Sequence, residues 1–169
     1  MKIRKERIQD RAAIGELIQK AFAGAAHSDG TEAELAAALW KGTAFIPELS
    51  LIAEQDGELA GYILFTKAEV GGQTVLALAP LAVKPKFQRQ GIGTALLRHG
   101  HEMAQKLGYS YSLVLGDPAY YGREGYVPAE PLGVVIPAGF PSEYFLLRPL
   151  QKEASPISGA VCYAPEFGI

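Results

Sequence analysis

The sequence predicts a mixed α/β domain of the α+β type, with a mostly antiparallel central sheet, flanking helices and one parallel strand–helix–strand unit. Two tight reversals predict the antiparallel part. Asp56-Gly57 and Gly71-Gly72 each separate apolar runs, and such residues tolerate the positive φ of a two-residue hairpin turn. The parallel unit is predicted by an apolar strand over 74–83, a helix over 92–107 and a second strand over 109–115, joined by a right-handed crossover.

The N-terminal third predicts one strand and two helices. Loose alternation over 2–8 indicates a short strand, and apolar residues at helical spacing indicate a helix over 11–22. Thr31 is placed to cap a second helix that runs to about Trp40, because Glu34 follows in capping-box register. The hairpin strands are expected over 49–53 and 59–65.

The C-terminal part predicts shorter elements. A helical turn over 118–123 is followed by short strands at 126–127 and 143–147, and a tail strand is expected at 160–163. No linker divides the chain, so residues 1–169 are expected to form one domain, with a tail from about 151 packing on it. The edge of the tail strand could pair with a second copy, so both a monomer and a homodimer are compatible with the sequence.

Composition excludes several classes of protein. The formal net charge of −2 comes without a basic stripe, which argues against nucleic-acid binding. Cys162 is the only cysteine, so neither an internal disulfide nor a cysteine-based zinc cluster can form. The longest apolar stretch, 74–83, is about half the length of a membrane-spanning helix. We therefore expect a soluble, cytoplasmic protein without membrane contact.

Residues 83–94, VKPKFQRQGIGT, predict a site for phosphate or diphosphate. An apolar strand ends, a loop turns, and a helix begins where two glycines expose the backbone. The first N–H groups of a helix lack internal partners and carry the positive end of its dipole. Glycines allow an anion to approach these amides, and Lys86 and Arg89 add positive charge beside them.

Two common phosphate loops do not fit this segment. A Walker loop requires Lys after its second glycine, but Gly93 is followed by Thr94. A dinucleotide-binding turn requires a third glycine where Leu96 stands, and it belongs to a doubly wound sheet. A nucleotide-binding module is therefore a minor alternative.

The remaining pattern, Gln/Arg-x-x-Gly-x-Gly/Ala, resembles the coenzyme A diphosphate loop of the GNAT superfamily of N-acetyltransferases. Two other segments are similar to that family: 79–85, APLAVKP, before the loop, and 115–126, LGDPAYYGREGY, after it. The tail over 158–168 resembles that of a bacterial subgroup with a Gly-Asp-Pro-x-Tyr-Tyr segment. The resemblance thus extends over essentially the whole chain.

The resemblance implies an enzyme that transfers acetyl from acetyl-CoA directly to a primary amine of a small molecule, peptide or protein. It implies that the pantetheine arm lies along the strand that ends at Val83 and that the diphosphate meets the following turn. The implied cofactor-binding residues are Leu81, Ala82, Val83, Gln88, Arg89, Gln90, Gly91, Ile92, Gly93 and Thr94.

For catalysis, Tyr121 matches the family position that protonates the departing sulfur, and a phenol is protonated at neutral pH. Tyr120 is the competing assignment, because it is the adjacent residue. Asp117 stands where the family more often has Asn. It could contact the pantetheine or the substrate amine, or only cap the following turn. His27 is the candidate for a further direct role, since the family places its loop, with Glu32 and Glu34, over the acceptor site.

Other side chains carry less weight in the prediction. Trp40, Phe45 and Tyr62 fit the hydrophobic core better than the acceptor pocket. His99 and His101 are two residues apart on a helix and face different ways, so no metal site is predicted. A non-catalytic acyl-CoA-binding sensor or scaffold of the same fold is the alternative function, because its loop would have the same sequence.

Overall fold

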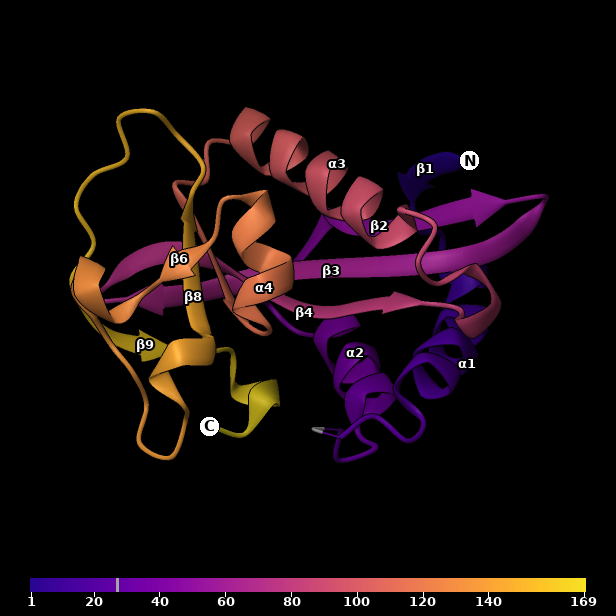
Figure 1. Cartoon of the computed structure of the whole chain (residues 1–169), viewed down its shortest axis with the longest axis horizontal. Helices are drawn as coiled ribbons and strands as arrows, with labels where there is room; N and C mark the ends of the chain where they lie inside the picture. The colour runs from indigo at the N-terminus through magenta and orange to yellow at the C-terminus, as the bar shows by residue number, and fades with distance from the viewer. Residues whose placement is uncertain (27) are drawn as a thin grey trace.

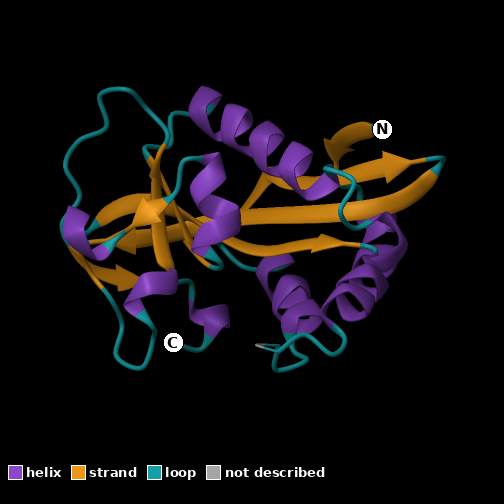
Figure 2. Cartoon of the chain, viewed as in Figure 1, coloured by secondary structure: helices purple, strands orange, loops and turns teal. Residues whose placement is uncertain are grey.

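A central sheet with β1 and β6 at its two ends organises the chain, and the computed structural model describes residues 1–26 and 28–169. The strand order is β1-β2-β3-β4-β5-β8-β6, and β9 pairs with both β3 and β7. Only β4–β5 and β7–β9 are parallel pairs. The structure therefore confirms the predicted fold class, a mostly antiparallel sheet with one parallel strand–helix–strand unit (Figure 2). The strands are β1 (Lys2–Lys5), β2 (Phe45–Gln55), β3 (Glu58–Val70), β4 (Gln73–Val83), β5 (Tyr111–Leu115), β6 (Val127–Pro128), β7 (Val134–Val135), β8 (Phe145–Pro149) and β9 (Gly159–Cys162).

Helices cover both faces of this sheet (Figure 1). Helix α3 packs on one face, and α1 and α2 pack on the other. Strand periodicity explains the division, because successive side chains of β3 point to opposite faces: Ile63 joins the α3 core, whereas Tyr62 and Leu64 join the α1–α2 core. In the described residues, none of the helices is long and apolar enough to span a membrane. The α-helices are α1 (Arg11–Phe22), α2 (Glu32–Trp40), α3 (Ile92–Lys106) and α4 (Pro118–Tyr121).

The two predicted hairpin turns are confirmed. Asp56 and Gly57 have φ of 54° and 75°, and they join β2 to β3 in the two-residue geometry that right-twisted strands favour. Gly71 and Gly72 join β3 to β4 in the same way. These turns fix the register of the three-strand meander from which the site is built.

The capping box predicted at α2 does not form. The Thr31 hydroxyl donates instead to Asp29 Oδ1 at 2.6 Å, and the same oxygen accepts the Thr31 N–H at 2.9 Å. The Thr31 hydroxyl is thus hydrogen-bonded within the turn before the helix, and it is not available to the helix amides as the prediction required. Thr31 still lies immediately before α2, so the predicted start of the helix is confirmed, whereas the predicted capping by the Thr31 side chain is wrong.

The tail strand is paired within the chain. Val161 and Cys162 lie opposite Val70 and Glu69 of β3, and Gly159 lies opposite Val134 of β7. The tail therefore extends the sheet of its own chain. The prediction missed β7, a two-residue strand whose sequence has no alternation to identify it.

A buried polar chain ties α3 to β5. His101 on α3 is 4% exposed, and its Nε2 lies 2.9 Å from the Tyr126 hydroxyl, which lies 2.8 Å from Ser112 Oγ on β5. Burial, with a smaller contribution from the Arg148 charge, lowers the pKa of His101 to about 3. His101 is therefore neutral in the folded protein at every pH above about 4.

This burial predicts a specific acid sensitivity. Unfolded His101 takes up a proton below about pH 6.5 whereas folded His101 does not, so its contribution to stability declines as pH falls from 6.5 towards 3. Between pH 7 and pH 5 the wild type is expected to lose about 2 kcal/mol more unfolding free energy than His101→Gln. Urea titrations of both proteins at the two pH values measure this difference. Equal losses would show that His101 is already accessible to protons in the folded state.

Candidate active site

The turn between β4 and α3 presents free backbone donors. Gly91 has φ of 85°, a left-handed value that favours glycine, and it precedes α3 without a side-chain cap. Ala95 is the first residue of α3 whose backbone N–H makes a hydrogen bond: it donates to the Gly91 carbonyl at 3.0 Å. In the described chain, the N–H groups of residues 89–94 donate to no other protein atom. They form a run of free donors at the positive end of a 15-residue helix, which suits an anion.

Side chains of the same turn brace it. Gln88 Nε2 donates to the Val83 carbonyl at 3.0 Å, and Gln90 Nε2 donates to the Lys86 carbonyl at 3.2 Å. Both glutamines were predicted to contact the cofactor, and here their side-chain amides donate to backbone carbonyls of the same segment. Arg89 is exposed, with φ of 63°.

One predicted charge points elsewhere. The ammonium of Lys86 pairs with Glu58 at 2.7 Å, and Lys84 pairs with the same carboxylate at 2.5 Å. The structure therefore corrects the expectation that Lys86 supplies charge to the turn: it is held at the β2–β3 hairpin. Of the two cations predicted beside the turn, Arg89 is the one left to face an anion.

Gly93 makes room for a tyrosine. A Cβ at this position would lie 3.0 Å from the Tyr120 hydroxyl and 3.6 Å from Val83 Cγ2. The Tyr120 hydroxyl also lies 3.2 Å from Thr94 Oγ1. Tyr120 thus packs against the turn at the start of α3, a contact that its position 26 residues downstream of Thr94 does not reveal.

Strands β4 and β5 separate towards this turn. They pair only at Leu76↔Ser112 and Ala77↔Leu113, although β4 continues to Val83 and β5 to Leu115. Beyond these two pairs the β5-facing edge of β4 has no strand partner in the described chain. Leu81, Ala82 and Val83 lie on this edge, which leads directly to the free amides. An extended ligand with polar groups can pair with such an edge.

The two candidate tyrosines lie side by side but contact different parts of the chain. The Tyr121 ring packs on Gly116 at the end of β5, so closely that a Cβ there would lie 2.4 Å from the ring. The ring also meets Tyr120 and Tyr126 edge-on, with centroids 5.0 and 5.5 Å away. Burial, with a smaller contribution from Tyr120, raises the pKa of Tyr121 above its usual value. Tyr121 therefore keeps its proton at neutral pH, as a proton donor requires.

Asp117 has two contacts that bear on its predicted role. Its Oδ1 accepts the Ala119 N–H at 2.9 Å and so caps α4. The residue also lines the larger of two cavities, beside Leu115 and Gly116. His27, the other predicted catalytic residue, lies outside the described residues.

The larger cavity has a volume of about 1040 Å³ and opens at the end of β5. Five segments line it: the loop after α1, the exposed side of α2, the end of β5, the segment before β8 and the C-terminal turn at 165–167. The sequence gives no local signal for it, because residues more than 100 positions apart meet there. The lining residues are Phe22, Ala25, Ala26, Ser28, Asp29, Thr31, Glu32, Glu34, Leu35, Ala38, Leu115, Gly116, Asp117, Pro141, Tyr144, Glu166 and Phe167.

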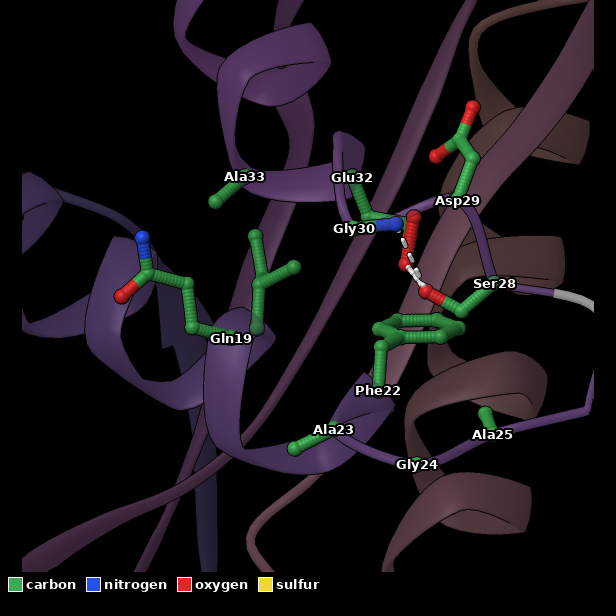
Figure 3. A pocket seen from close by; sticks show the side chains of 11 residues that line it. Gln19, Phe22, Ala23, Gly24, Ala25, Ser28, Asp29, Gly30, Glu32 and Ala33 are labelled. Atoms are coloured by element: carbon green, nitrogen blue, oxygen red, sulfur yellow. Dashed lines mark hydrogen bonds between the residues drawn. The ribbon is translucent and has the colours of Figure 1, made fainter.

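A smaller cavity of about 530 Å³ lies between α1 and the start of α2 and shares five lining residues with the larger one, Phe22 among them. Figure 3 shows the Ser28 hydroxyl between the Gly30 amide and the Glu32 carboxylate, beside the Phe22 ring. The Glu32 carboxylate is thus held by Ser28 at the boundary between the two cavities. Glu32 and Glu34 both line the larger cavity, as the predicted acceptor side requires.

The aromatic residues considered for the acceptor pocket belong to the core. Tyr62 is fully buried, and its hydroxyl bonds Ser50 at 2.6 Å and accepts the Trp40 indole N–H at 2.9 Å. Trp40 and Phe45 pack against the same core, and neither lines the larger cavity. Their role is to hold α2 against the sheet.

Comparisons with known proteins agree with this geometry. The sequence matches the acetyltransferase (GNAT) family over residues 12–123, and the chain belongs to that family. It is 35% identical over 144 residues, 80% of each chain, to the uncharacterised N-acetyltransferase YjhQ of Escherichia coli (strain K12).

Two crystal structures resemble the whole fold. A GNAT family N-acetyltransferase of Escherichia coli, YhbS, in complex with CoA, has a TM-score of 0.89 at 29% identity, covering 99% of this chain and 92% of its own. A GNAT family acetyltransferase of Brucella melitensis in complex with acetyl-CoA has a TM-score of 0.82 at 33% identity, covering 98% and 97%.

Proposed function

We propose that this protein transfers the acetyl group of acetyl-CoA directly to a primary amine. The observation that carries the proposal is the row of free amides over residues 89–94, which stands where the unpaired edge of β4 ends. The CoA complex of YhbS and the acetyl-CoA complex of the Brucella enzyme support the choice of ligand.

In this proposal the cofactor lies across the gap between β4 and β5. The diphosphate accepts hydrogen bonds from the amides of residues 89–94, with Arg89 adding charge. The pantetheine arm pairs with the backbone of Leu81, Ala82 and Val83 in the way that an added strand would. The thioester then lies near the point where β4 and β5 part, beside Gly116 and Tyr121.

The chemistry follows from this placement. The nitrogen of a neutral amine attacks the thioester carbonyl carbon; the C–N bond forms, the C–S bond breaks, and the sulfur leaves with the electron pair. Tyr121 gives its proton to that sulfur, and the nitrogen loses its extra proton to a base or to water. Asp117 lies at the cavity end of the same gap and orients the amine. The products are an acetamide and CoA thiol.

Thiol release tests the activity directly. Acetyl-CoA is mixed with the protein and a panel of small amines and of peptides with a free N-terminus or a lysine, and free thiol is followed. We expect thiol release that depends on the amine. Acetyl-CoA binding by calorimetry without release for any amine would instead indicate the sensor or scaffold. Tight ATP or NAD binding that CoA does not displace would indicate a nucleotide-binding module.

A further inference from the structure

The larger cavity has a strongly one-sided charge. Its described lining includes five carboxylates and no Lys or Arg. The whole chain is close to neutral, with 18 acidic and 16 basic residues, so this excess is local. A concave surface of one sign concentrates ligands of the opposite sign. The five are Asp29, Glu32, Glu34, Asp117 and Glu166.

Two of the five carboxylates have at least one oxygen without a partner in the described chain. In the described chain, Glu34 makes no hydrogen bond or ion pair, and it is exposed. Hydrogen bonds from the Thr31 side chain and amide lower the pKa of Asp29, so that residue stays ionised. Glu166 Oε2 is shielded from solvent and has no donor among the described residues, an arrangement that costs free energy until positive charge is nearby.

The carboxylates are spread along the cavity rather than gathered at one point. They come from the start of α2, the end of β5 and the C-terminal turn, and no three acidic, His or Cys side chains of the described chain form a metal-holding group. Apolar side chains such as Leu35 and Leu115 line the same cavity. A cavity lined by negative charges from separate segments and by apolar side chains matches a cation whose charges are separated by methylene groups.

We propose that the acceptor is an aliphatic di- or polyamine, an inference that rests on the proposed acetyl transfer. One nitrogen, neutral when it reacts, reaches the thioester beside Leu115 and Gly116. A second, charged nitrogen lies near the start of α2, where the carboxylates of Glu32 and Glu34 both line the cavity. Acetylation changes the first nitrogen only: its C–N bond forms as the C–S bond breaks, and the distant ammonium remains charged and paired.

A matched pair of amines tests this proposal. 1,5-Diaminopentane and pentylamine share one reactive end and differ in the second ammonium. We expect kcat/KM to be about 10-fold higher for the diamine, the effect of one partly exposed ion pair. In the double variant Glu32→Gln/Glu34→Gln the ratio should fall below about 3-fold while the acetyl-CoA Kd stays unchanged, because those charges lie on the acceptor side.

The control is Glu102→Gln, which removes one negative charge from the exposed side of α3, away from the cavity, and should leave the ratio intact. The role of charge can also be tested in the wild-type protein: raising NaCl from about 50 to about 500 mM should lower kcat/KM more for the diamine than for pentylamine. Equal kcat/KM for the two amines, with both acetylated, would overturn the polyamine proposal and leave the transferase standing. No acetylation of any amine would overturn both.

Two sources of the same chemistry remain to be separated, a free polyamine and a lysine in a basic peptide. Spermidine and a tetrapeptide with two lysines are therefore compared at equal concentration. A higher kcat/KM for spermidine supports the proposal. A higher value for the peptide overturns it in favour of a protein substrate.

Discussion

Tyr121→Phe is expected to lower kcat by about 100-fold or more, while the Kd for acetyl-CoA changes by less than about 2-fold. The substitution removes only the hydroxyl, so the ring can still pack on Gly116 and against Tyr126. The buried hydroxyl holds its proton at neutral pH, and without it the thiolate must leave unprotonated. Single-turnover rates together with calorimetry separate the two effects.

Tyr120→Phe is the matched control, because it removes a hydroxyl from the adjacent ring. That hydroxyl contacts Thr94 at the diphosphate end of the gap, so its loss should weaken acetyl-CoA binding a few-fold and leave kcat nearly intact. Gly116→Ala gives a second test, since the added methyl would lie 2.4 Å from the Tyr121 ring and must displace it. Full-rate transfer by Tyr121→Phe would remove Tyr121 from the mechanism.

Thr94→Glu is expected to weaken acetyl-CoA binding by about 30-fold, from roughly 2 kcal/mol of repulsion between the new carboxylate and the diphosphate. Thr94 is the third residue of α3, where a carboxylate stabilises a helix by about 0.3–1 kcal/mol. That gain offsets the lost contact with Tyr120, so the free energy of unfolding should change little. The affinity for acetyl-CoA should therefore fall while the free energy of unfolding stays nearly the same, so misfolding cannot account for the lost affinity.

Thr94→Gln has nearly the same size as Thr94→Glu and carries no charge. It should weaken acetyl-CoA binding by less than about 3-fold, which isolates the contribution of charge. Calorimetry and urea unfolding of the three proteins give the comparison. Equal affinities for the Gln and Glu variants would place the diphosphate away from the start of α3.

Features encoded by short segments could be predicted from the sequence. The Asp-Gly and Gly-Gly turns, the bounds of α1 and the start of α3 at Ile92 all depend on residues within a few positions of one another. The turn before α3 is of the same kind, because its free amides follow from a helix start with a left-handed Gly91. Local conformational preference is enough in these cases.

Features that depend on tertiary contacts could not be predicted. The pairing of Lys86 depends on the β2–β3 hairpin lying beside it. Tyr120 and Tyr121 are adjacent in sequence, and only the packing of α4 separates their hydroxyls. Glu34 and Glu166 line the same acidic cavity although they are far apart in the sequence, so no short segment contains both.

The central claim is that the free amides at the start of α3 bind the diphosphate of CoA. Calorimetric titration of the wild-type protein with acetyl-CoA and with S-acetylpantetheine, which lacks the diphosphate and the nucleotide, tests it most directly. We predict a Kd in the micromolar range for acetyl-CoA and binding at least about 100-fold weaker for S-acetylpantetheine, with the difference greatly reduced in Thr94→Glu. Equal affinity for the two ligands, or no heat with acetyl-CoA, would contradict the claim.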